Sequence, residues 1–264
     1  MEKDLDFRDP FIIAEIGGNH EGNIDYAKKL LIDAAQAGAD AVKFQTYFPD
    51  YIVSKVEDPD RHEHFEKFSL KIEDYLTLSK LASENGVMFM SSIWDPDSLV
   101  VLNDLVSIHK IGSGDLTNYP LIKKIIETNK PLIISSAMAT IEEIEETVSF
   151  IETENPNYTD SKKLAILQCV AMYGEPSDNY ANLNVIPTLA KRFPKHVIGY
   201  SDHTIGNYAA NIAVALGAKV LEIHFTDDKS RDFRDHHISI TSDELTELKD
   251  NILKTQKLIG SKEK

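Results

Sequence analysis

The chain has 264 residues, of which 42% are hydrophobic and 27% are charged, a composition that supports one sizeable buried core. Its formal net charge of -15 argues against nonspecific binding to nucleic acid or to an anionic membrane, because both are negatively charged themselves. The single cysteine excludes an internal disulfide, the amino terminus does not resemble a signal peptide, and no apolar run approaches the roughly 20 residues that span a bilayer. We therefore expect a cytoplasmic protein.

Short apolar runs alternate with amphipathic stretches of helical period along nearly the whole chain. The expected strand–helix pairs are, in chain order, 11–16 with 25–38, 41–47 with 72–85, 87–92 with 97–104, 106–113 with 119–129, 131–137 with 141–152, 164–170 with 183–193, 197–201 with 206–217, and 220–225 with 242–258. A long polar connection separates the second strand from its helix. Eight consecutive units without a break in composition predict a single α/β domain over residues 1–264, a (β/α)8 TIM barrel rather than an open doubly wound sheet.

Polar side chains follow or interrupt the expected strands at their carboxyl ends, which is where barrels of this kind carry out their chemistry. These residues are Glu15, Lys43, Gln45, Ser91, Ser92, Lys110, Ser113, Ser135, Ser136, Gln168, Tyr173, Ser201, His203 and His224. One polar residue in such a place is usually satisfied within a turn. A ring of them around one mouth predicts a binding site.

Lys43 and Lys110 have apolar neighbours on both sides, and a buried lysine needs an anionic partner. One interpretation pairs a lysine with Glu15 inside the barrel mouth. The other adds the serine hydroxyls and the backbone N–H groups of "GSGD" (112–115), which together would hold a phosphate. The "GSG" alone is a weak signal, because it lacks the full dinucleotide-binding pattern.

His203 and His224 follow neighbouring strands, so their imidazoles are expected to converge on a divalent metal such as manganese or zinc. The alternative is that one is satisfied by hydrogen bonds and the other is exposed. Two further histidines, in "RHEHFEKF" (61–68), are expected on a solvated face or a lid. Cys169 has no neighbouring base and is interpreted as a core residue rather than a nucleophile.

Five motifs strongly resemble the sialic acid synthase family, in order and over nearly the whole chain. They are "AEIGGNHEG" (14–22), "VKFQTY" (42–47), "KIGSGDLTNYPLI" (110–122), "GYSDHTIG" (199–206) and "EIHFTDDKSRDFRDHH" (222–237). Members of this family condense phosphoenolpyruvate with N-acetylmannosamine or a related aldose to give a nonulosonic acid. They usually continue into a small antifreeze-like domain that caps the partner subunit's barrel, which this chain does not include, and the resemblance implies a homodimer.

The resemblance also implies a role for individual residues. The residues implied to hold phosphoenolpyruvate are Lys43, Ser92, Lys110, Ser113, Ser135 and Ser201. The residues implied to contact the sugar are Gln45, Tyr173 and Asp235. His203 and His224 would bind manganese, and Glu15 would be the acid–base residue, so that Glu15, Lys43 and His203 are the expected catalytic residues.

Two positions depart from the family pattern. The sugar-contacting glutamate after "GSG" is Asp115 here, one methylene shorter, and an asparagine common in the family is Ala171. The arginine that the cap supplies to the N-acyl group has no counterpart. Without that cap, we expect the mouth to be covered by a partner subunit and by the 48–70 loop, with 61–68 facing the sugar, and we expect an acceptor other than plain N-acetylmannosamine.

Three alternatives remain open for the function. The first is a synthase that uses a phosphorylated sugar to make a related 3-deoxy-ulosonic acid. The second is a Schiff-base aldolase that uses Lys43 or Lys110. The third is a barrel that is not catalytic or that depends on a partner protein.

Overall fold

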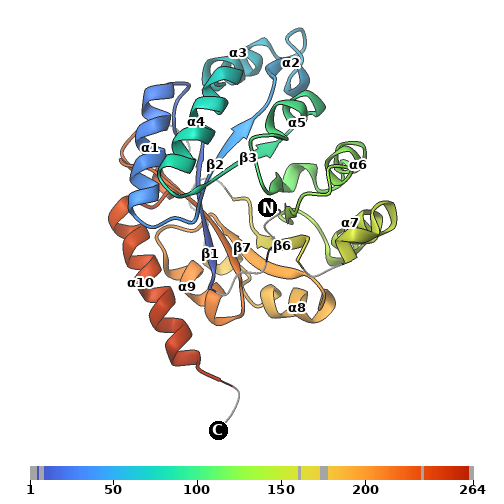
Figure 1. Cartoon of the computed structure of the whole chain (residues 1–264), viewed down its shortest axis with the longest axis vertical. Helices are drawn as coiled ribbons and strands as arrows, with labels where there is room; N and C mark the ends of the chain where they lie inside the picture. The colour runs from blue at the N-terminus through green and yellow to red at the C-terminus, as the bar shows by residue number, and fades with distance from the viewer. Residues whose placement is uncertain (1–4, 6–8, 160–161, 173–177, 233–234, 262–264) are drawn as a thin grey trace.

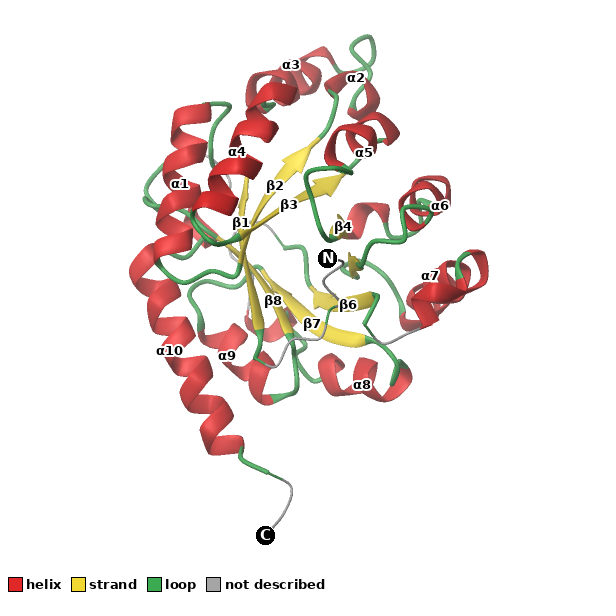
Figure 2. Cartoon of the chain, viewed as in Figure 1, coloured by secondary structure: helices red, strands yellow, loops and turns green. Residues whose placement is uncertain are grey.

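The structure is a computed structural model of the chain, and it describes residues 5, 9–159, 162–172, 178–232 and 235–261. Within them, parallel strands pair in chain order and close into a barrel, with β8 beside β1 (Figures 1 and 2). The strands are β1 (Phe11–Gly17), β2 (Ala41–Thr46), β3 (Met88–Ile93), β4 (His109–Ile111), β5 (Leu132–Ser135), β6 (Leu164–Cys169), β7 (Val197–Asp202) and β8 (Val220–His224). The predicted single-domain (β/α)8 barrel is confirmed.

The helices lie in a ring outside the strands (Figure 2). They are α1 (Ile24–Gln36), α2 (Pro49–Ile52), α3 (Pro59–Phe68), α4 (Ile72–Glu84), α5 (Pro96–Leu102), α6 (Tyr119–Ile126), α7 (Ile141–Glu154), α8 (Val185–Arg192), α9 (Tyr208–Ala215) and α10 (Ser242–Ile259). Short 3-10 turns add η1 (Ser113–Asp115), η2 (Pro156–Thr159), η3 (Asp178–Tyr180) and η4 (His236–Ile238). Side-chain caps define several helix starts: Asn23 accepts from two N–H groups of α1, and Thr140 and Thr241 form capping boxes with α7 and α10.

The expected elements agree with the structure to within three residues at each bound. The fourth strand is shorter than predicted at both ends. Its carboxyl end is set by a turn at Gly112, where the N–H of Asp115 donates to the Gly112 carbonyl at 3.1 Å and η1 begins. The polar connection after β2 is not a plain loop but contains α2 and α3, the latter capped by Asp58 with Pro59 at its first position. None of the helices in the described part of the chain combines the length and the low charge needed to cross a membrane.

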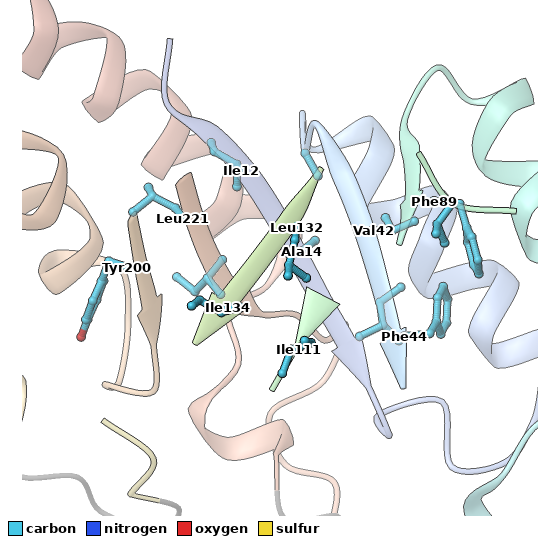
Figure 3. Packing of buried hydrophobic residues seen from close by; sticks show 14 of the residues in the cluster. Ile12, Ala14, Val42, Phe44, Phe89, Ile111, Leu132, Ile134, Tyr200 and Leu221 are labelled. Atoms are coloured by element: carbon cyan, nitrogen blue, oxygen red, sulfur yellow. The ribbon is translucent and has the colours of Figure 1, made fainter. Parts of the chain in front are cut away.

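Side chains alternate along each strand between two apolar clusters. One cluster fills the space between strands and helices, and Figure 3 shows Ile12, Val42 and Phe89 within it. The other draws residues from nearly all the strands, including Ile13 and Met90, and therefore fills the barrel interior.

The inward face changes character toward the carboxyl ends of the strands. Four inward apolar residues are each followed two positions later by a charged one: Ile13 by Glu15, Ala41 by Lys43, Ile108 by Lys110 and Val220 by Glu222. Because side chains repeat their direction every second residue in a strand, the charged residues stand on top of the apolar interior. The barrel thus presents buried charges at the bottom of its mouth.

Candidate active site

A cavity of about 530 Å³ lies at the carboxyl ends of the strands. The predicted site residues that line it are Glu15, Lys43, Gln45, Ser92, Lys110, Ser113, Asp115, Ser135, Ser201, His203 and His224. These residues come from all parts of the chain, and the strand register brings them together: Glu15 is paired with Lys43 on one side and with His224 on the other.

Lys43 and Glu15 form a buried ion pair on the cavity floor. Lys43 Nζ lies 2.6 Å from Glu15 Oε2 and donates to Ser92 Oγ at 2.9 Å, while Gln45 Nε2 donates to Glu15 Oε1 at 3.0 Å. The sequence-based alternative that pairs a lysine with Glu15 is therefore correct, and it holds together with the cluster of serine hydroxyls.

Gly17 makes room for this arrangement. Its φ of +54° lies in the left-handed region that favours glycine. A Cβ at this position would lie 2.9 Å from Glu15 Oε1 and 3.1 Å from Gln45 Nε2. Any side chain at residue 17 would therefore disturb the hydrogen bond that orients Glu15.

Lys110 lies on the opposite part of the floor. Its Nζ donates to Ser135 Oγ at 2.7 Å and to the Ile111 carbonyl at 3.0 Å. Ser113, from the turn after β4, accepts from the backbone N–H of Ala137 at 3.0 Å. The hydroxyl of Ser135 thus lies beside a fixed ammonium group, as an anion site requires, and Ser113 lines the same cavity.

Glu222 is a site residue that the sequence reasoning missed. Its carboxylate lies 3.9 Å from Lys43 Nζ and 3.7 Å from Lys110 Nζ, and it accepts from Ser201 Oγ at 3.3 Å. It stands within the apolar run "VLEIHF", where it reads as part of a strand interior. Its position two residues before His224 is the sequence feature that could have identified Glu222, because it places both side chains on the inward face of the strand.

Burial and charge pairing set the protonation of these four groups. Burial raises the pKa of Glu15 to about 7, against the opposing attraction of Lys43. Burial also lowers the pKa of the Lys110 ammonium, with Glu222 opposing. For Lys43 and Glu222, burial disfavours the charged form, but the neighbouring opposite charges prevail: the pKa of Lys43 is raised and that of Glu222 is lowered.

His203 and His224 face each other at the β7–β8 side of the cavity. Their ring centroids are 5.1 Å apart with an interplanar angle of 61°, and both side chains are buried. Burial, followed by the proximity of His224, lowers the pKa of His203 to about 3, so its imidazole is neutral, as a metal ligand must be. No cluster of three or more His, Cys, Asp or Glu side chains suited to a metal occurs among the described residues.

Three polar residues expected at the mouth, and Asp235, which was expected to contact the sugar, do not line the cavity. Ser91 Oγ shares a 2.7 Å hydrogen bond with Thr46, Ser136 Oγ donates to the Leu167 carbonyl at 2.8 Å, and Gln168 Nε2 donates to the Ala181 carbonyl at 3.3 Å. These side chains point to the other face of their strands and support the backbone. Asp235 is buried near His203 rather than at the cavity wall, and Tyr173 lies outside the described residues.

Cys169 is buried, as its interpretation as a core residue expects, and it also lines the cavity. Its Sγ lies 3.7 Å from His203 Nδ1. Burial raises the pKa of the thiol to about 11, so it stays protonated at neutral pH. A protonated thiol is a poor nucleophile, in agreement with the expectation that Cys169 is not one.

The outer wall on the β2–β5 side contains residues that the sequence reasoning did not single out. Tyr51 and Ile52 of α2, Trp94 after β3, Asn118 before α6 and Met138 after β5 line the cavity there. No residue of α3 does so, which contradicts the expectation that 61–68 faces the sugar.

Comparisons with known proteins match most of the chain to one family. A family model described as the NeuB family matches residues 30–264. An uncharacterized protein of Methanocaldococcus jannaschii is 41% identical over 96% of this chain and 73% of its own length, and the N,N'-diacetyllegionaminic acid synthase of Legionella pneumophila is 38% identical over 96% and 74%. The crystal structure of an N-acetylneuraminic acid synthetase from Leptospira borgpetersenii, in complex with citrate, superposes with a TM-score of 0.90 at 30% identity, over 97% of this chain and 87% of that one.

Proposed function

Since the chain belongs to the NeuB family, we propose that it condenses phosphoenolpyruvate with an amino-sugar aldose to give a nonulosonic acid and phosphate. The chain is an enzyme of the transferase class that forms a carbon–carbon bond, and phosphoenolpyruvate-dependent condensation is the chemistry of its family. That the aldose is an amino sugar is our proposal for this chain.

The composition of the cavity floor supports this proposal. Two buried ammonium groups, Lys43 and Lys110, lie among the hydroxyls of Ser92, Ser113, Ser135 and Ser201. We assign the phosphate and carboxylate of phosphoenolpyruvate to this floor, because fixed cations and hydroxyl donors in a water-poor site bind anionic oxygens strongly.

Glu15 is suited to move protons during the reaction. C3 of phosphoenolpyruvate attacks the aldehyde carbon of the open-chain sugar, and the new alkoxide takes the proton of Glu15. Water then adds to the cationic C2, and the Glu15 carboxylate accepts the proton that this water loses. The C2–O bond to phosphate then breaks, the C2 hydroxyl becomes the ketone, and its proton leaves with the phosphate as hydrogen phosphate, so Glu15 ends as it began. Its pKa of about 7 allows both transfers near neutral pH.

His203 and His224 would hold a divalent metal, for which we propose manganese. Two buried imidazoles on neighbouring strands fit such an ion, provided that water and substrate oxygens complete its coordination. When bound, the metal would act as a Lewis acid toward the aldehyde oxygen. The homodimer expected from the resemblance also remains a prediction, and the mass of the protein in solution tests it.

A Schiff-base aldolase is the second candidate, because burial lowers the pKa of Lys110 as such an enzyme requires. Against it, Lys110 Nζ is already held by Ser135 and the Ile111 carbonyl. Borohydride reduction in the presence of pyruvate would attach pyruvate to the chain only if the aldolase is correct.

A phosphate-release assay tests the proposed function directly. Phosphoenolpyruvate is supplied with a panel of aldoses, including N-acetylmannosamine, its 6-phosphate and a diacylated 6-deoxy amino sugar, with and without manganese. We expect phosphate release that depends on an aldose. Release without any aldose, or none with the whole panel, would contradict the proposal.

A further inference from the structure

The segments that follow β2 and β3 contribute Tyr51, Ile52 and Trp94 to the cavity lining, and we call these three side chains the aromatic wall. Tyr51 and Ile52 lie on α2, and Trp94 follows β3 directly. Ile52 and Trp94 are half-buried, whereas Tyr51 is 61% exposed. The wall belongs to strands β2 and β3, away from the histidine pair on β7 and β8.

A layer of aromatic rings behind the wall holds Trp94 in place. The Tyr47 ring stacks on Trp94 with centroids 5.1 Å apart and an interplanar angle of 18°. Phe65 of α3 meets both rings edge-on, at 5.2 Å from Tyr47 and 6.2 Å from Trp94, and its carbonyl accepts from the Tyr47 hydroxyl at 3.2 Å. Such stacked and edge-on contacts fix ring orientation.

Hydrogen bonds fix α2, which by itself is too short to be stable. His62 of α3 is buried and lies 2.7 Å from the Asp50 carboxylate on α2. Asp95, which caps α5, accepts from the backbone N–H of Phe48 at 3.0 Å, and the Tyr51 hydroxyl donates to Asp97 at 2.7 Å. The connection that contains α2 and α3 therefore forms a fixed surface on the cavity, although α3 itself does not line the cavity.

Charge is distributed unevenly between the floor and the outer part of the cavity. Among the described residues that line it, the lysines and arginines are Lys43 and Lys110, both on the floor and both within reach of carboxylates. The outer part contains the aromatic wall, the Asn118 amide, Met138 and the Asp115 carboxylate. Asn118 donates to Asp115 at 3.1 Å and orients it.

We infer that the aromatic wall selects the acceptor, and that it favours an uncharged amino sugar over a sugar phosphate. This inference rests on the proposed function, which assigns the floor to phosphoenolpyruvate. A sugar that reacts with phosphoenolpyruvate must lie above it, where it meets the wall on one side. The N-acyl methyl groups and the C–H faces of an amino sugar lose water-exposed apolar area against these rings. A phosphate would instead meet Asp115, with the described lysines already engaged below.

Trp94 is the single tryptophan of the chain, so its fluorescence reports on the wall without requiring turnover. Each sugar is titrated into the protein in the presence of phosphoenolpyruvate and a chelator. We expect a saturable change with N-acetylmannosamine or the diacylated 6-deoxy sugar and a much weaker response to N-acetylmannosamine 6-phosphate. Tighter binding of the 6-phosphate would contradict the preference for an uncharged sugar. The absence of a response to any sugar would contradict the binding of the acceptor at the aromatic wall.

Kinetics of variants provide the second measurement. Trp94→Ala should raise KM for the acceptor by about tenfold or more and leave KM for phosphoenolpyruvate within about twofold, the size expected for lost apolar contact in a pocket. Trp94→Phe should recover most of the loss. The matched control is Tyr208→Ala for Tyr51→Ala, because Tyr208 is a 76% exposed tyrosine that does not line the cavity.

His62 is a positioning residue in this scheme. His62→Ala should raise KM for the acceptor at nearly unchanged kcat, whereas His64→Ala, on the exposed side of the same helix, should change neither. Equal increases in both KM values, or none, would overturn the inference while leaving phosphate release intact. Conversely, a saturable fluorescence response without any phosphate release would support the wall and refute the proposed function.

Discussion

The carboxylate of Glu222 bridges the two lysines of the cavity floor, with Oε1 3.9 Å from Lys43 Nζ and Oε2 3.7 Å from Lys110 Nζ. Together with Glu15, it places two carboxylates beside the two lysines of the floor. The carboxylates favour the charged form of both lysines, although burial still lowers the pKa of Lys110. An incoming substrate must compete with Glu222 for them.

Glu222→Gln should tighten the binding of phosphoenolpyruvate, by about fivefold or more, because it removes a negative charge next to the site of the anion. The change keeps the shape of the side chain and its contact with Ser201. Isothermal titration calorimetry with phosphoenolpyruvate alone measures the effect, and Glu222→Asp, which keeps the charge, is the control. Weaker binding by Glu222→Gln would show that the carboxylate positions the lysines rather than opposing the substrate.

Lys110→Met should weaken phosphoenolpyruvate binding by about 100-fold and change KM for the sugar little. Removing one partner of a buried, hydrogen-bonded charge pair costs several kcal/mol. Lys123→Met on α6, an exposed lysine paired with Glu154, is the matched control and should bind normally. If Lys110→Met mainly raised KM for the sugar, the phosphate would have been placed on the wrong part of the floor.

Phosphoenolpyruvate binding should take up a proton between about pH 7 and 8. The pKa of Glu15 is about 7, and a bound anion raises it further, so a carboxylate that is about half ionised at pH 7 and mostly ionised at pH 8 becomes protonated. Binding heats in two buffers of different ionisation enthalpy measure this uptake. Glu15→Gln should abolish the uptake and lower turnover by about 100-fold or more. Unchanged uptake in that variant would exclude Glu15 as the acceptor.

His203→Ala and His224→Ala should each abolish turnover and lower the bound metal content without unfolding the barrel, because both residues lie at the mouth rather than in the apolar interior. Metal content after dialysis and the circular dichroism spectrum are measured alongside phosphate release. His64→Ala should retain both metal and activity. Full activity of the unaltered protein after exhaustive chelation would contradict the metal assignment.

His109→Leu should make the protein less sensitive to acid. His109 is fully buried at the start of β4, and no described residue forms a hydrogen bond with either of its ring nitrogens. Burial, with a smaller contribution from Lys130, lowers its pKa to about 4, against the ordinary 6.5. Below pH 6.5 the unfolded chain takes up a proton that the folded chain does not, so stability falls as the pH falls.

The expected size of this effect is about 2 kcal/mol between pH 7 and pH 5. Urea unfolding at both pH values should show this additional loss in the unaltered protein relative to His109→Leu. The exposed His64→Ala is the control and should keep the full acid sensitivity. Equal losses in the unaltered protein and His109→Leu would mean that a solvent path reaches the imidazole.

The sequence alone determined the barrel and most of the floor. Apolar runs of strand length and helical periodicities are local properties, and eight of each in alternation permit few other folds. The lysines, serines and histidines were recognisable because polar residues at the ends of apolar runs are unusual. Glu222 was hidden because it stands inside such a run, where local pattern alone does not distinguish it from a strand interior.

Tertiary structure alone decided which of these residues meet. Ser91 and Ser92 are adjacent, yet only Ser92 reaches the cavity, because successive side chains point to opposite faces of a strand. Likewise, Glu15 lies beside Lys43 and His224 because of the stagger between strands, and α2 reaches the cavity because α3 and α5 hold it there. Stagger and closure depend on all the strands at once, whereas a sequence pattern reports only on its own segment.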